Sequence, residues 1–114
     1  MDDRHDTIDR LWDALNRQDI DAAAALLHPE VDWQDLMNGG RRIGVADVRV
    51  YWAGVFKIMR PESTSLTFAP TEDGRVAVRT HHSIRDPLGK FWTEETVTHL
   101  FGFRDGLLSS MDVA

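Results

Sequence analysis

Apolar residues follow helical spacing in the first half of the chain and strand spacing in the second half. Up to about residue 59 they recur every three or four positions, as on the buried face of an amphipathic helix. Asp19 can cap the second predicted helix, and Pro29 and Pro61 are expected to end the second and third. The predicted helices span about residues 3–17, 21–27 and 45–59.

Strict alternation of apolar and polar residues predicts strands elsewhere. The predicted strands cover residues 31–35, 65–69, 76–85, 91–103 and 107–113. Turn sequences separate them, such as Asn38-Gly39-Gly40 and Glu72-Asp73-Gly74. Helices followed by an antiparallel meander are typical of an α+β fold. We therefore expect one domain over residues 1–114: a cone of three N-terminal helices packed on a strongly curved, mainly antiparallel sheet, with a pocket at its open end.

Two segments carry a family resemblance. Asp35, a loop and then Arg42-Ile43-Gly44-Val45-Ala46-Asp47-Val48-Arg49-Val50-Tyr51-Trp52 resemble the ketosteroid isomerase pattern without a gap. Phe101-Gly102-Phe103-Arg104-Asp105-Gly106-Leu107-Leu108 resembles a hairpin common in SnoaL-like sequences. Together they resemble the SnoaL-like and ketosteroid isomerase-like branches of the nuclear transport factor 2-like superfamily. The resemblance implies a cystatin-like α+β barrel, which hosts isomerases, cyclases, dehydratases, hydrolases and binding proteins.

The resemblance also implies roles for individual residues of the site. Ketosteroid isomerases use an Asp base with an oxyanion hole made of a Tyr and a protonated Asp. Asp35 stands at the position of the base, Leu11 at that of the Tyr, and His99 near that of the protonated Asp. Leu11 can donate no hydrogen bond, which argues against steroid isomerisation by that mechanism. An Asp with two histidines also resembles the scytalone dehydratase branch, although that branch uses tyrosines as well.

Strand parity predicts which side chains face the interior. Val31, Trp33 and Asp35 share one face, and the apolar faces of the later strands include His82 and His99. If these faces point into the cone, Asp35, His82, His99 and Glu95 point into it too. The predicted apolar pocket walls are Trp12, Trp33, Trp52, Phe56, Met59 and Phe101.

These groups suit proton transfer without a cofactor. Burial in an apolar cavity raises the pKa of a carboxylic acid, so Asp35 could serve as general base. His99 or His82 could act as acid or oxyanion donor, which fits isomerisation, cyclisation or dehydration. In the alternative interpretation, Asp35 caps the following loop through backbone N–H groups, and the histidines are half-buried strand residues.

Two other function classes remain open. The chain could be a non-catalytic binding module that holds a small apolar ligand in the same cavity. It could also be an interaction domain, with the cavity filled by Trp and Phe side chains and the outer sheet face paired with a partner. An open cavity with Asp35 bonded to its own loop would favour the binding module.

Composition limits the partners, the cellular location and the metal sites that we expect. The net charge of −6 argues against a nucleic-acid partner. No apolar run approaches the roughly 20 residues of a membrane helix, and no secretory signal is evident, so we expect a cytoplasmic protein. The absence of cysteine excludes disulfides and thiolate metal sites. Asp35, His82 and His99 lack metal-ligand spacing, so we expect no metal.

The outer face of the predicted sheet indicates a homodimer. It mixes apolar and charged residues, as symmetric interfaces do. The residues concerned are Arg79, His81, Arg85, Trp92, Glu94, Thr96, Thr98 and Leu100. Sedimentation at micromolar concentration is expected to give twice the mass of one chain, and the mass of a single chain would contradict this prediction.

Overall fold

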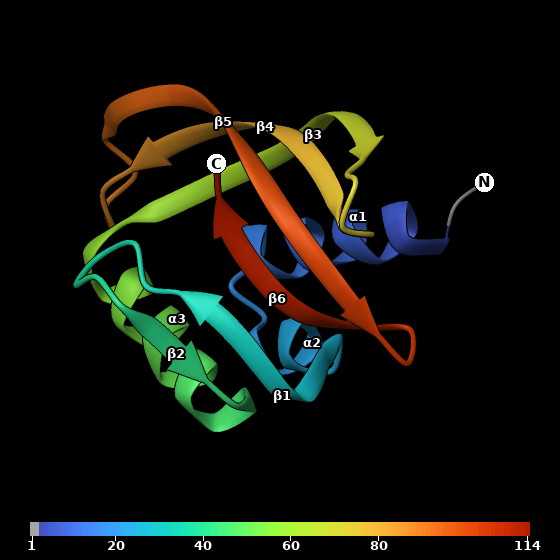
Figure 1. The fold of residues 1–114 in the computed structure, drawn as a ribbon. Coiled ribbons are helices and arrows are strands. Elements are labelled where there is room, and N and C mark those ends of the chain that lie inside the picture. The colour runs from blue at the N-terminus through green and yellow to red at the C-terminus, as the bar shows by residue number, and fades with distance from the viewer. Residues whose placement is uncertain (1–2) are drawn as a thin grey trace.

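The structure, a computed structural model, describes residues 3–114 as three helices on one side of a single six-stranded sheet (Figure 1). The helices are α1 (Asp3–Asn16), α2 (Ile20–Ala24) and α3 (Val45–Ile58). The strands are β1 (Leu27–Gln34), β2 (Arg41–Ile43), β3 (Arg60–Pro70), β4 (Val76–Arg85), β5 (Phe91–Arg104) and β6 (Leu107–Val113).

The strand order is β2-β1-β6-β5-β4-β3, and only the β1–β6 pair is parallel. The sheet is curved but not closed, because β2 and β3 are its two edges. The predicted α+β fold is confirmed.

Several element boundaries differ from the prediction. The second helix ends at Ala24, because buried Leu27 already pairs with Leu108 of β6 as a strand residue. Pro29 therefore lies within β1, and Pro61 lies within β3 instead of directly ending α3. The short edge strand β2, which pairs with β1, is not among the predicted strands.

The sheet bends around the helices at irregular positions in its long strands. The register shifts in β3 between Ser65 and Thr67, and in β5 between Gly102 and Phe103. A Cβ at residue 102 would clash with the hydroxyl of Ser110 on β6, so the two strands approach closely where β5 changes register.

The core lies between the helices and the inner face of the sheet. The largest fully buried side chains come from both halves of the chain: Phe101, Ile8, Leu11, Leu108, Val31, Val48, Val76, Val78 and Thr80. Within residues 3–114, no helix has the length and hydrophobicity to cross a bilayer.

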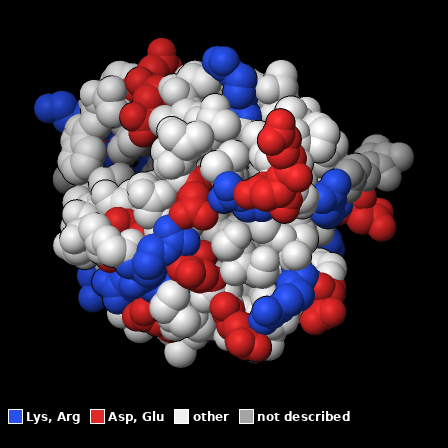
Figure 2. All heavy atoms as spheres, viewed as in Figure 1, with Lys and Arg blue, Asp and Glu red and all other residues white. Residues whose placement is uncertain are grey.

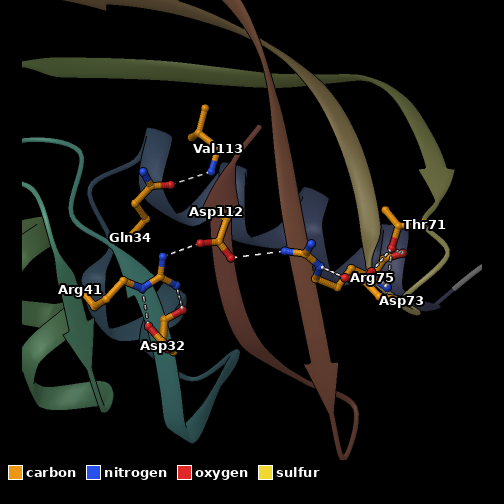
Figure 3. Close-up of polar contacts among 8 residues, drawn as sticks. All are labelled: Asp32, Gln34, Arg41, Thr71, Asp73, Arg75, Asp112 and Val113. Carbon is orange, nitrogen blue, oxygen red and sulfur yellow. Dashed lines mark hydrogen bonds and ion pairs between the residues drawn. The ribbon is translucent and has the colours of Figure 1, made fainter.

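Acidic and basic side chains are interleaved over the molecular face that carries β1, β6 and β5 (Figure 2). Asp112 of β6 forms ion pairs with Arg41 of β2 and with Arg75 before β4 (Figure 3). Arg41 also binds Asp32 of β1 at 2.7 Å, and Arg75 binds Asp73 at 2.9 Å. The chain of pairs runs from the β2 edge to the β3–β4 hairpin and links segments that are far apart in sequence.

Candidate functional site

A cavity of about 280 Å³ lies between α1, α3 and the inner face of the sheet. Most of its wall is apolar and is formed by Trp12, Leu15, Trp33, Leu36, Met37, Tyr51, Trp52, Val55, Phe56, Met59, Pro61, Ile84 and Met111. Its polar lining is formed by Ser63, His82, Glu95 and His99. A larger hollow of about 780 Å³ runs along the outside of α1, but it is shallow and lined mainly by aspartates. The cavity between the helices and the sheet is the better candidate for a small organic ligand.

The two cavity histidines face each other from neighbouring strands. His82 lies on β4 and His99 on β5, with ring centroids 5.1 Å apart and ring planes at 85°. In the strand register His82 stands opposite Glu95, and His99 stands opposite Val78. This register gathers three polar side chains into one part of an otherwise apolar wall.

Each histidine is held by a hydroxyl group. Ser63 Oγ lies 2.7 Å from His82 Nδ1, and Thr80 Oγ1 lies 3.0 Å from His99 Nδ1. Within residues 3–114 neither ring has a hydrogen-bond partner at Nε2. The hydroxyl groups therefore fix both rings, while the second nitrogen of each ring stays unused by the protein.

Burial keeps both imidazoles neutral at neutral pH. It lowers the pKa of His99 to about 3, with a smaller contribution from His82 nearby. The pKa of His82 is lowered by burial too, although the negative charge of Glu95 opposes the shift. Trp12 contacts both rings edge-on, and its buried indole N–H has no hydrogen-bond partner among the described residues.

Asp35 is buried beside the cavity rim and engaged by its own loop. Its Oδ1 accepts hydrogen bonds from the backbone N–H groups of Met37 at 2.9 Å and Asn38 at 2.8 Å. Its Oδ2 accepts from Arg42 Nε at 3.0 Å. The hydrogen bond from Asn38 is the largest cause of a lowered pKa for Asp35, and burial opposes it. The expected raised pKa is therefore not found, because N–H donors replace water around the carboxylate.

The Asp35 loop forms one side of the cavity mouth. Leu36 and Met37 line the cavity directly after Asp35, while the carboxylate itself does not line it. The Tyr51 hydroxyl accepts a hydrogen bond from the Leu36 N–H at 3.2 Å and ties the loop to α3. Arg42, which binds Asp35, also donates a hydrogen bond to Asp47 at the start of α3, so the loop is held to this helix at a second point. In this geometry Asp35 positions two lining residues.

Most of the predicted pocket residues line the cavity. These are Trp12, Trp33, Trp52, Phe56, Met59, Glu95, His82 and His99. Phe101 does not, because it is fully buried behind the wall, where its ring stacks on His99. Sequence reasoning missed Tyr51 and Ser63. Tyr51 precedes Val55 and Met59 at helical spacing, which could have placed it on the cavity face, but no local signal marks Ser63.

The described residues contain no group of three or more His, Cys, Asp and Glu side chains that could hold a metal ion. His82 and His99 lie together in the cavity, whereas the Asp35 oxygens are turned to their own loop. A site of two histidines and this carboxylate is therefore not assembled.

Comparison with known proteins places the fold. The family model of the SnoaL-like domain matches residues 8–111. A candidate polyketide cyclase from Sinorhizobium meliloti is 24% identical, with a TM-score of 0.80 over 96% of this chain and 94% of that one. TerC, crystallised with polyporic acid, is 21% identical, with a TM-score of 0.83 over 99% of this chain and 91% of TerC. A Δ5-3-ketosteroid isomerase from Mycobacterium sp. is 15% identical, with a TM-score of 0.83 over 100% of this chain and 93% of the isomerase. No curated protein sequence matches the chain.

Replacing Asp35 with Asn tests the anchor role. We expect Asp35→Asn to lower the urea midpoint at pH 7, because the amide cannot pair with Arg42 while also accepting both backbone hydrogen bonds. The folded pKa is lowered, so the stabilisation by the charged group is present above the ordinary value of 3.8 and is lost as the pH falls below it. The difference in urea midpoint between the wild type and Asp35→Asn should therefore be smaller at pH 3 than at pH 7.

The control is Asp9→Asn, which changes an exposed carboxylate on α1. It should leave the midpoint nearly unchanged at both pH values. Equal midpoints for wild type and Asp35→Asn at pH 7 would contradict the anchor role.

Proposed function

Because the chain belongs to the SnoaL-like domain family, we propose that it binds a small, largely apolar organic molecule in the cavity between α1, α3 and the sheet. The observation that carries the proposal is an open cavity with aromatic walls and one cluster of polar groups. TerC, a fold neighbour crystallised with an organic acid, supports this use of the fold. The interaction-domain alternative requires a cavity filled by Trp and Phe, and this cavity is open.

The cavity volume suggests the size of the ligand. An apolar cavity of about 150 Å³ accommodates one benzene ring. A cavity of about 280 Å³ therefore suits a molecule of about two fused rings. Such a molecule could place an oxygen against the histidines while its rings contact the tryptophans and Phe56.

Binding can be read from the tryptophans themselves. Three of the four tryptophans, Trp12, Trp33 and Trp52, line the cavity, and Trp92 lies on β5 away from it. Adding the neutral ketone 2-tetralone is expected to shift the indole N–H resonances of the first three in an NMR titration and to leave that of Trp92 in place.

Variants of α3 provide the matched pair for this experiment. Val55 lines the cavity and Val50 is 63% exposed on the same helix. Val55→Phe should weaken binding by about tenfold or more by filling the cavity, equivalent to about 1.4 kcal/mol. Val50→Phe should leave binding unchanged. Shifts that spread over all four indoles, or that survive Val55→Phe, would contradict cavity binding.

A second candidate function is proton transfer on the bound molecule. His82 and His99 favour it, because both rings are neutral, fixed at Nδ1 and 5.1 Å apart. We assign the base role to His82 rather than to Asp35, whose oxygens are occupied by three N–H donors. His82 would take a proton from the carbon next to a carbonyl, and Glu95 opposite would stabilise the imidazolium.

His99 can serve the other half of such a reaction. Thr80 Oγ1 lies 3.0 Å from His99 Nδ1 and 3.4 Å from the carbonyl of Val78. The Thr80 hydroxyl has a single proton, and in the proposed tautomer it donates that proton to His99 Nδ1 and not to the Val78 carbonyl, so the ring proton is on Nε2. A neutral imidazole N–H at that position can stabilise a developing enolate oxygen. The two histidines would then supply the base and the oxyanion donor of an isomerase, cyclase or dehydratase.

Deuterium exchange tests this candidate. In D2O the protein is expected to accelerate deuterium incorporation next to the carbonyl of 2-tetralone, and His82→Gln should lower the catalysed rate by about 10² or more. Two control variants should retain the catalysed rate of deuterium incorporation. They are His81→Gln, which changes the opposite face of β4, and Asp35→Asn, if it remains folded. Because burial lowers the pKa of His82, the rate should stay constant as the pH falls to 6.5 and decline only below that value.

No acceleration over the protein-free reaction would remove the enzymatic candidate and leave the binding module. A folded Asp35→Asn variant without exchange activity would return the base role to Asp35. The homodimer through the outer sheet face, where Trp92 is 49% exposed, stays a prediction beside either function.

A further inference from the structure

The charged groups around the cavity are unevenly distributed. Among the described lining residues, Glu95 carries a full charge, and none is Lys or Arg. Glu95 is exposed to solvent on β5, opposite His82, so its carboxylate lies at the border between the cavity and water. Within the described part of the chain, the fixed charge on the cavity wall is thus negative.

Two arginines that lie close to lining residues are already engaged. Arg42 is paired with Asp35 and Asp47, each at 3.0 Å, and lies over the Tyr51 ring. Arg60 donates hydrogen bonds to backbone carbonyls at the end of α3. Neither guanidinium lines the cavity, so no Lys or Arg among the described lining residues is placed to bind a ligand carboxylate.

The interior of the cavity also resists positive charge. His99 is 3% exposed and lies among the rings of Trp12, His82 and Phe101. Burial lowers its pKa to about 3, because a buried, largely apolar environment disfavours an imidazolium. A ligand ammonium at the same depth would lose its hydration in the same way.

We propose that the cavity selects a neutral molecule of about two fused rings carrying a hydroxyl or carbonyl group, and that Glu95 excludes ligands with a carboxylate. This inference rests on the proposed binding function and specifies the ligand class. The ligand oxygen would bond to the free Nε2 of a cavity histidine, and its rings would contact Trp12, Trp33 and Trp52. Glu95 repels an anion at the entrance, and the neutral histidines provide no charge to compensate for its desolvation.

Two ligands of equal ring size test the proposal. Isothermal titration calorimetry at pH 7.5 with 2-naphthol and with 2-naphthoate compares a neutral and an anionic form of one skeleton. We expect 2-naphthol to bind at least about tenfold more tightly, a difference of about 1.4 kcal/mol. Glu95→Gln should narrow the gap by strengthening 2-naphthoate binding, with little effect on 2-naphthol.

The matched control is Glu94→Gln. Glu94 neighbours Glu95 on β5 but pairs with His81, away from the cavity lining. Removing its charge should leave the ratio of the two affinities unchanged. An equal response to both variants would indicate a general effect of net charge and overturn the assignment to Glu95.

The outcomes separate this inference from the proposed function. Equal binding of 2-naphthol and 2-naphthoate, or tighter binding of the anion, overturns the selectivity while cavity binding stands. Binding of 2-tetralone without binding of 2-naphthol overturns the hydroxyl part of the assigned ligand class and leaves the carbonyl part standing. If none of the three molecules binds, the proposed function fails and the selectivity fails with it.

Discussion

The antiparallel register of β3, β4 and β5 is the constraint on which the site depends. It places Ser63 opposite His82, and His82 in turn opposite Glu95. The same register brings His99 within 5.1 Å of His82, although the two residues belong to different strands. A slip of one residue between β4 and β5 would turn one set of side chains to the outer face. The polar groups of the cavity are therefore a consequence of strand pairing, held in place by packing against Trp12 of α1.

Alternation and helical spacing predicted the fold well because both reflect which face of an element is buried. The parity of β4 and β5 placed His82, His99 and Glu95 on the cavity side, and the apolar stripe of the third helix placed Trp52, Phe56 and Met59 there. Phe101 shares the face of His99 but lies deeper, at 0% exposure. Parity identifies the face of a strand but cannot tell a cavity wall from the core behind it.

Asp35 shows a different limit of the sequence. Its position and parity are compatible with a base in a pocket, and also with an anchor of the loop that follows. The choice depends on where Met37, Asn38 and Arg42 direct their N–H groups, which is set by the closed loop between β1 and β2. The backbone bonds from Gly39 to Asp35 and from Asp35 to Gly40 close that loop. Three donors stabilise the anion and make it a weak base, so the same residue type serves a different purpose here.

The fold therefore leaves the chemistry to the few polar groups that line the cavity. Relatives with this architecture share at most 24% identity with the chain among those compared, so their activities do not transfer with the fold. In this chain the cavity holds two neutral imidazoles, each fixed by a hydroxyl, and one carboxylate at its border. Such a wall can accept or donate hydrogen bonds and can move a proton, but it lacks a cation to bind an anionic substrate. The charge of the lining groups thus restricts the possible ligands more than the shape of the cavity does, because aromatic walls accept many ring skeletons of similar size.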